Sequence, residues 1–138
     1  MLLRKIEKED LDVHYFKLLG ELSPSLNTEE NFDKSWPVFV DNNDHHIMVA
    51  VSTSDIVGTA SLLIERKING RTAGHIEDVV VSKQHRGRGI GELLIEDLVK
   101  TAKKEQCYKI ILNCSDKNVP FYNKFGFSKV DNGMKMII

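Results

Sequence analysis

The sequence predicts a mixed α/β (α+β) fold, in which helices pack against one sheet. Two observations lead to this class. Short β-branched stretches follow one another in the middle of the chain, and stretches with apolar residues every three or four positions lie on either side of them. The length of 138 residues corresponds to one domain, which we assign to residues 1–138.

The N-terminal part of the chain predicts one strand and two helices. Residues 2–6 have the composition of a short strand. A helix is expected to begin at Lys8–Asp10 and to end before Ser23-Pro24-Ser25, which breaks the apolar pattern. Residues Thr28–Asn31 indicate the start of a second helix, whose length Pro37 limits because proline disrupts a helix interior.

The middle of the chain predicts three successive strands, at Ile47–Ser52, Val57–Arg66 and Gly74–Ser82. The Asn69-Gly70 pair is typical of a hairpin turn and joins the last two of them. Strict alternation sorts the side chains of the third strand onto two faces. One face is expected to carry Ile76, Asp78 and Val80, and the other Glu77, Val79 and Val81.

The C-terminal part begins with the strongest helical pattern of the chain, over Gly91–Lys104. Cys107–Leu112 is rich in isoleucine and predicts a buried strand. A short helix is expected over Asn118–Phe125, with Gly126 as its C-terminal cap. The chain is then expected to end in a strand within Phe127–Ile138.

The charge balance excludes some classes of function. Lys and Arg number 19 and Asp and Glu 20, so 19 − 20 gives a net charge of −1. This argues against a protein that binds nucleic acid or a membrane surface through bulk charge. No apolar run reaches the roughly 18 residues of a membrane span. The chain becomes charged at Arg4, so we expect no signal peptide.

The two cysteines, Cys107 and Cys114, predict a reduced, cytoplasmic setting. Their separation is odd, so in a strand they point to opposite faces and are not expected to form a disulfide. We expect both to be buried structural thiols. His, Cys, Asp and Glu show no metal-ligand spacing, so no metal is expected.

The most informative segment is Arg86-Gly87-Arg88-Gly89-Ile90-Gly91, called the glycine turn below, which leads from a strand into a helix. Glycines leave the backbone accessible, and the N–H groups at a helix start lack intrahelical acceptors, so the segment suits a phosphate or pyrophosphate. The Walker A pattern is absent, and the dinucleotide pattern fails at Glu92. The alternative is a turn that needs glycine for its geometry and exposes its arginines to solvent.

The glycine turn resembles the acyl-CoA signature of the GNAT superfamily of N-acetyltransferases, Gln/Arg-x-x-Gly-x-Gly/Ala. Three more segments carry the resemblance in the same order, at Gly74–Val81, Cys107–Cys114 and Asn118–Phe127. Together they resemble the members that acetylate glucosamine 6-phosphate, most densely over residues 64–127. The resemblance implies a mixed, mostly antiparallel central sheet with helices on both faces. It also implies direct transfer from acetyl-CoA, and a homodimer whose sugar sites take residues from both subunits.

The resemblance implies a role in CoA binding for several of these residues. The strand edge at Val79, Val80 and Val81 would pair with the pantetheine arm, and the backbone N–H groups of Gly87–Glu92 would hold the pyrophosphate. Asn118 would lie near the CoA arm, with a helix cap as the alternative role. The hydroxyl of Tyr122 would assist departure of the thiolate, and the alternative is a tyrosine that serves only the core.

The sugar phosphate site is also implied by the resemblance. Glu77 and Asp78 would bind the amino sugar, and the alternative is an ion pair with Arg66, Lys67 or His75. The remaining substrate-binding residues implied are Ser23, Lys67, Tyr108 and Lys109.

The sequence departs from the family at two positions. Asn113 stands where close relatives have an acidic residue, so it cannot act as a base, and Ile137 stands where they have an arginine. The proton of the amine would then pass to Glu77 through a water, or to a backbone carbonyl near Asn113. Two alternative functions remain. The chain could transfer the acetyl group to a different amine, or it could be a CoA-binding sensor without catalytic activity.

Overall fold

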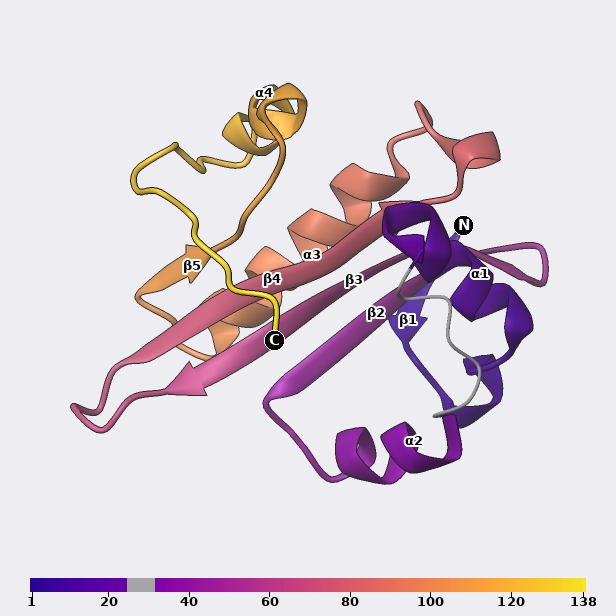
Figure 1. Cartoon of the computed structure of the whole chain (residues 1–138), viewed down its shortest axis with the longest axis horizontal. Coiled ribbons are helices and arrows are strands. Elements are labelled where there is room, and N and C mark those ends of the chain that lie inside the picture. The colour runs from indigo at the N-terminus through magenta and orange to yellow at the C-terminus, as the bar shows by residue number, and fades with distance from the viewer. Residues whose placement is uncertain (25–31) are drawn as a thin grey trace.

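The structure is a computed structural model, and it describes residues 1–24 and 32–138. The described residues form a five-stranded sheet whose strands lie side by side in chain order (Figure 1). The first four strands run antiparallel to their neighbours, and β5 runs parallel to β4. This confirms the mixed, mostly antiparallel sheet. The helix start expected at Thr28–Asn31 lies outside the described residues.

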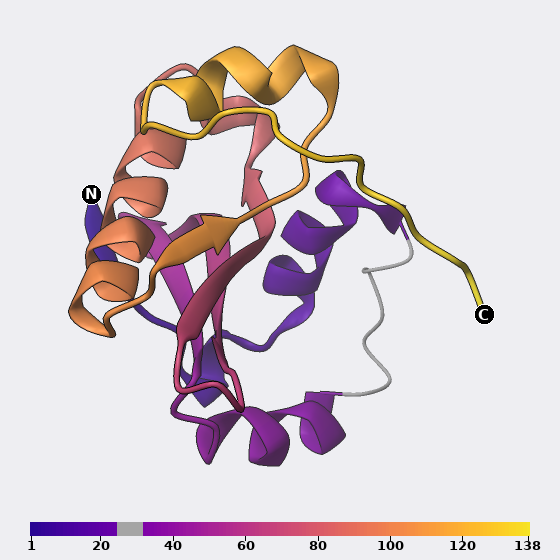
Figure 2. The same ribbon diagram turned by 90° about the vertical axis from the view of Figure 1, so that its left-hand side faces the viewer.

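The elements have the following bounds. The strands are β1 (Leu2–Lys5), β2 (His45–Ser52), β3 (Asp55–Arg66), β4 (Thr72–Val81) and β5 (Lys109–Ile111). The helices are α1 (Val13–Leu22), α2 (Phe32–Val40), α3 (Ile90–Lys104) and α4 (Val119–Asn123). Helix α3 packs against one face of the sheet and α1 against the other, as Figure 2 shows, so helices on both faces are confirmed.

Two of the predicted helix boundaries need correction. Lys8–Asp10 forms only a turn of 3-10 helix, and α1 begins after Asp12. The Asp12 carboxylate accepts hydrogen bonds from the backbone N–H groups of His14 and Tyr15, at 2.9 and 3.0 Å, and this cap fixes the helix start. Helix α2 continues past Pro37 to Val40, so proline does not end it.

The C-terminal strand expected within Phe127–Ile138 is wrong for this structure, in which these residues form no strand. A strand needs a neighbour that pairs with its backbone, and the edge strand β5 is only three residues long. The apolar side chains of Met134, Met136 and Ile138 are therefore exposed.

The predicted alternation of β4 is wrong beyond Glu77, because the strand contains a β-bulge. Asp78 has a φ of 50°. The register pairs on either side of the bulge are Ser61↔Glu77 and Thr59↔Val80. Between these pairs β4 has two residues, Asp78 and Val79, whereas β3 has only one. The extra residue moves Val79 onto the α3 face together with Ile76. Val80 is buried on the opposite face instead.

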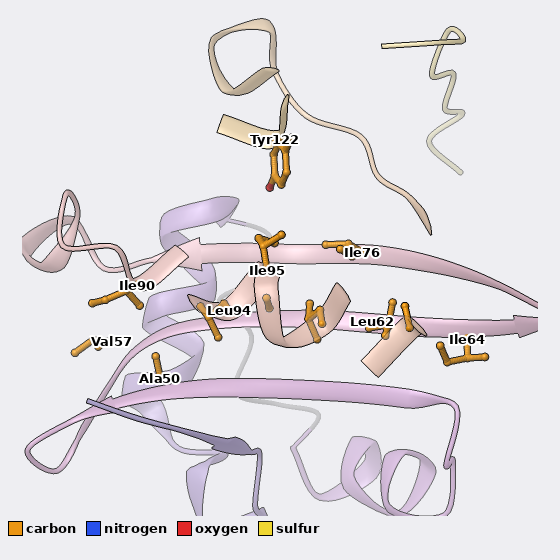
Figure 3. Close-up of a cluster of buried hydrophobic side chains, with 12 residues drawn as sticks. Ala50, Val57, Leu62, Ile64, Ile76, Ile90, Leu94, Ile95 and Tyr122 are labelled. Atoms are coloured by element: carbon orange, nitrogen blue, oxygen red, sulfur yellow. The ribbon is translucent and has the colours of Figure 1, made fainter. Parts of the chain in front are cut away.

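The main core lies between the sheet and α3 (Figure 3). The helix contributes Leu94, Ile95 and Leu98, which have no exposed surface. Gly58 on β3 allows this close approach, because a methyl group there would lie 3.2 Å from the Leu94 side chain. The position of α3, and therefore of the glycine turn before it, depends on this packing.

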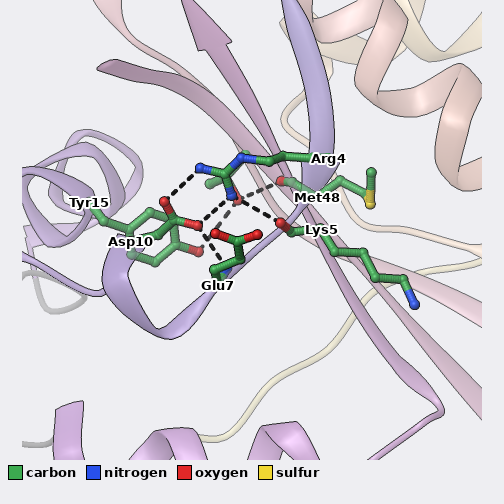
Figure 4. Close-up of polar contacts among 7 residues, drawn as sticks. Arg4, Lys5, Glu7, Asp10, Tyr15 and Met48 are labelled. Atoms are coloured by element: carbon green, nitrogen blue, oxygen red, sulfur yellow. Dashed lines mark hydrogen bonds and ion pairs between the residues drawn. The ribbon is translucent and has the colours of Figure 1, made fainter. Parts of the chain in front are cut away.

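A polar network ties the N-terminal segment to the sheet (Figure 4). Arg4 donates two hydrogen bonds to the Asp10 carboxylate, at 2.7 and 2.8 Å, and this pairing lowers the pKa of Asp10. The Tyr15 hydroxyl lies 3.4 Å from that of Thr59, and burial raises the pKa of Tyr15 to about 12. The network holds α1 against the face of the sheet that α3 leaves free.

Replacing Leu94 by alanine is expected to lower the free energy of unfolding by about 2–5 kcal/mol, because the substitution leaves a cavity in the core. The matched control is Leu93→Ala on the next position of α3, where the side chain is 42% exposed. We expect this control to cost less than about 1 kcal/mol. Urea unfolding measures both, and equal losses would contradict the assignment of the core.

Candidate active site

A cleft of about 360 Å³ opens between β4 and the chain that follows β5. Four segments contribute its lining residues: the end of α1, the bulged part of β4, the segment after β5, and the region of α4. The residues are Leu22, Ile76, Glu77, Asp78, Val79, Leu112, Asn113, Cys114, Ser115, Asn118 and Tyr122.

The cleft exists because β4 and β5 separate. Their pairing covers only Ala73–His75 of β4, and it ends at His75 opposite Ile111. Beyond that pair, Ile76–Val79 on one side and Leu112–Ser115 on the other line the cleft. In the described part of the chain, this edge of β4 therefore has backbone groups without a neighbouring strand, which an extended ligand can pair with.

Glu77 and Asp78 both line the cleft and are exposed. The alternative ion pairs do not form, because their expected partners are engaged elsewhere. Arg66 pairs with Asp44 and Glu105, and Lys67 and His75 both pair with Glu65. Within the described residues, the two cleft carboxylates thus have no cationic partner, and they suit a ligand with amine or hydroxyl groups.

Tyr122 serves both the core and the cleft. It is 9% exposed, packs edge-on against Phe121 and Phe127, and lines the cleft. Its hydroxyl points toward the sheet in Figure 3. Burial raises the pKa of Tyr122, so the phenol keeps its proton at neutral pH.

Two asparagines also belong to the polar lining. Asn118 precedes α4, but its side chain makes no capping hydrogen bond, so the alternative role as a cap is not formed. Asn113 lies after β5 and meets the C-terminal segment, because a methyl group on Gly133 would lie 2.9 Å from its Oδ1 atom. The absence of a side chain at residue 133 therefore allows the Asn113 carboxamide its position.

The glycine turn follows β4 after Ser82 and a turn of 3-10 helix at Lys83–His85, and it does not line the cleft itself. Gly87 and Gly89 have φ values of 76° and 78°, a left-handed backbone that favours glycine, and Gly89 caps the start of α3. The side chain of Arg86 folds back, and its Nε donates to the carbonyl of Val81 at 3.0 Å. Arg88 is exposed.

The other predicted site residues lie at differing distances from the cleft. Ser23 follows the lining residue Leu22 at the end of α1. Lys67, Tyr108 and Lys109 lie instead near the β3–β4 hairpin. Lys109 pairs with Ala73, four residues before Glu77 and so about 13 Å along the strand. The fold of a single chain therefore does not bring these three residues together with the cleft carboxylates.

Sequence reasoning missed five lining residues, namely Leu22, Ile76, Leu112, Cys114 and Ser115. The expectation that Cys114 is buried is wrong, because β5 ends before it and the thiol is exposed in the cleft. Cys107 is only half-buried, and both cysteines are free thiols.

Two features are absent from the described residues. No group of three or more His, Cys, Asp and Glu among them could hold a metal ion. No helix among them has the length and apolar character that crossing a membrane requires.

Comparison with known proteins identifies the family to which this architecture belongs. The model of the Acetyltransferase (GNAT) family matches residues 9–127. The chain belongs to the GNAT acetyltransferase family. This membership confirms the GNAT fold that the resemblance of the four segments implies, and GNAT acetyltransferases use acetyl-CoA.

Relatives within the GNAT family are similar over nearly the whole chain. The glucosamine 6-phosphate N-acetyltransferase of Trypanosoma brucei brucei is 39% identical, over 97% of this chain and 93% of its own. That of Arabidopsis thaliana is 37% identical, over 91% of this chain and 89% of its own. The crystal structure of the Arabidopsis thaliana enzyme superposes with a TM-score of 0.89, at 38% identity, and covers 99% of this chain and 97% of that one.

The contact between Gly133 and Asn113 gives a prediction. Gly133→Ala should displace the flexible Asn113 carboxamide and leave the backbone in place. In a nitrogen-15 NMR spectrum we expect the side-chain amide resonances of Asn113 to move, with a loss of stability below about 1 kcal/mol. Asn132→Ala, a change at the neighbouring exposed residue, should not move them. Unmoved Asn113 resonances in the Gly133→Ala variant would contradict the contact.

Proposed function

We propose that the chain transfers the acetyl group of acetyl-CoA directly to the amine of D-glucosamine 6-phosphate, giving N-acetyl-D-glucosamine 6-phosphate and CoA. The observation that carries this proposal is the cleft, whose lining includes two carboxylates without an ion-pair partner among the described residues and a tyrosine whose raised pKa keeps its proton. The similarity to enzymes of that activity over more than nine-tenths of the chain supports it. The product is of the kind from which UDP-N-acetylglucosamine is made.

Acetyl-CoA would bind along the open edge of β4. Its pantetheine arm pairs with the backbone of Val79, Val80 and Val81, where the sheet offers no strand, and Asn118 lies beside it. The pyrophosphate binds the backbone N–H groups from Gly87 to Glu92, at the positive end of the α3 dipole. The exposed arginines Arg86 and Arg88 add positive charge there.

The amino sugar would bind against Glu77 and Asp78. The neutral amine attacks the carbonyl carbon of the thioester, and a backbone N–H group near Val79 stabilises the oxyanion that forms. The proton of the amine passes through a water to Glu77, since the carboxamide of Asn113 cannot accept it. Asn113 instead orients the amine. Proximity of the two bound substrates contributes on the order of 7–11 kcal/mol to lowering the barrier.

Tyr122 would complete the reaction. When the tetrahedral intermediate collapses, the C–S bond breaks and the electron pair leaves on sulfur. The phenol hydroxyl then protonates or hydrogen-bonds the thiolate. The raised pKa of Tyr122 supports this role, because a general acid must hold its proton before the step.

The sugar site would be shared between two copies of the chain. Lys67, Tyr108 and Lys109 lie too far along the sheet to serve the cleft carboxylates of their own protomer, and a homodimer brings them to the cleft of the second copy. The exposed apolar side chains of the C-terminal segment support such an interface. We also propose one domain over residues 1–138. The two free thiols support a cytoplasmic setting.

A thiol-release assay tests the proposal directly. With acetyl-CoA present, we expect turnover with glucosamine 6-phosphate, much slower turnover with glucosamine, and none with glucose 6-phosphate, which lacks the amine. Tyr122→Phe should lower kcat about 10²-fold or more and leave the KM for the sugar nearly unchanged, because the hydroxyl acts after binding.

The matched control for Tyr122→Phe is Tyr15→Phe on α1, because Tyr15 lies outside the cleft lining. Tyr108→Phe would not serve as this control, since we place Tyr108 in the sugar site. Turnover with other amines but not with glucosamine 6-phosphate would contradict the substrate assignment. Binding of acetyl-CoA without thiol release from any amine would favour a CoA sensor.

A further inference from the structure

Three side chains form a compact cationic cluster beside the β3–β4 hairpin. The Cζ atom of Arg71 lies 3.8 Å from the ring centroid of Tyr108, and the Nζ atom of Lys109 lies 5.2 Å from the same centroid. We call these three residues the Tyr108 cluster. Arg71 matches none of the motif segments that identify the family, so sequence reasoning gave it no role.

No carboxylate among the described residues compensates the charges of the Tyr108 cluster. In the described part of the chain neither Arg71 nor Lys109 has a carboxylate partner within ion-pair distance. By contrast, Arg4, Arg66 and Lys67 all pair with one or more carboxylates. Two like charges on one ring repel each other, so an anion between them would relieve the repulsion and gain attraction to both.

The backbone around Arg71 is held in place. Its N–H donates to Asn69 Oδ1 at 3.0 Å, its carbonyl accepts from the N–H of Lys67 at 2.9 Å, and Gly70 provides the left-handed turn with a φ of 83°. The N–H of Tyr108 donates to the carbonyl of Thr72 at 2.9 Å, which fixes the ring beside the hairpin. The arginine is thus presented on a short, hydrogen-bonded turn.

The stacked geometry suits a phosphate. A guanidinium that lies over an aromatic face directs its N–H donors outward in its own plane, where they can bind two oxygens of one phosphate. Lys109 adds a second charge on the same ring. A carboxylate offers only two oxygens and one charge, so a phosphate monoester dianion matches two cations better.

We propose that Arg71 is a specificity-determining residue that, with Lys109 on the Tyr108 ring, binds the 6-phosphate of the amino sugar. This inference rests on the proposed function and adds to it a residue that lies outside the motif segments. It also accounts for Ile137, which stands where the family resemblance implies an arginine and is 84% exposed. Arg71 supplies a cation in place of the one that is absent at residue 137.

Calorimetric titration with glucose 6-phosphate tests the phosphate site without turnover, because this sugar has no amine. We expect the Kd of the Arg71→Gln variant to be about tenfold higher than that of the unmodified chain. Arg71→Lys should fall between them, since lysine keeps the charge but loses the planar contact. Lys100→Gln removes an exposed charge on α3 and is the control that should not change the Kd. A thermal melt of each variant checks that it is folded.

The outcomes separate this inference from the proposed function. An equal Kd for the unmodified chain and for Arg71→Gln overturns the inference, as does an absence of glucose 6-phosphate binding by the unmodified chain. If Arg71→Gln raises the Kd for glucose 6-phosphate but the unmodified chain does not acetylate glucosamine 6-phosphate, the phosphate site is upheld and the proposed substrate is rejected. If both hold, Arg71→Gln should also raise the KM for glucosamine 6-phosphate about tenfold and leave the KM for acetyl-CoA and the turnover of glucosamine unchanged.

Discussion

At Asp78, strand β4 contains one residue more than the facing part of β3. The backbone of Asp78 adopts a φ of 50°. A β-bulge bends a strand and increases its twist. Here the bulge lies three residues beyond His75, the last residue of β4 that pairs with β5, and both Glu77 and Asp78 line the cleft that opens there. An aspartate tolerates this conformation better than the valines that follow it, because left-handed backbone is costly for β-branched residues.

The rest of the molecule holds this irregularity in place from both faces. The leucines and isoleucines of α3 fix the inner face of the sheet, and they also fix the helix start that follows the glycine turn. On the other face, the bonds from Arg4 to Asp10 and from Tyr15 to Thr59 anchor α1, whose last residue, Leu22, lines the cleft. Packing and site geometry are therefore parts of one arrangement, in which the elements that bury the core also orient the cleft.

Much of the fold followed from the sequence because periodicity reports directly on burial. The β-branched, apolar stretches at β2 and β3, the Asn69-Gly70 hairpin and the three-four pattern of α3 were all predicted close to their observed bounds. The bulge was not, since alternation assumes one residue per register position and nothing in a run such as Glu77–Val81 marks the extra one. The C-terminal strand failed for a different reason, because strand propensity alone does not supply a pairing partner.

The site was predictable to a similar degree. Motif residues such as Glu77, Asn118 and Tyr122 do meet in one cleft, although they come from separate parts of the chain. The stacking of Arg71 on Tyr108 was not predictable, because it depends on how the hairpin folds back beside β5. Cys114 was misplaced because its exposure depends on where β5 ends.

An NMR titration of the nitrogen-15-labelled protein with acetyl-CoA would test most directly whether the bulge and the glycine turn form one binding edge. The amide resonances of Val79–Val81 and of Gly87–Gly91 should shift together and saturate at one Kd, while those of α2 stay unchanged. Shifts confined to other parts of the molecule, with the amides at the bulge unmoved, would contradict the role given to this edge of β4.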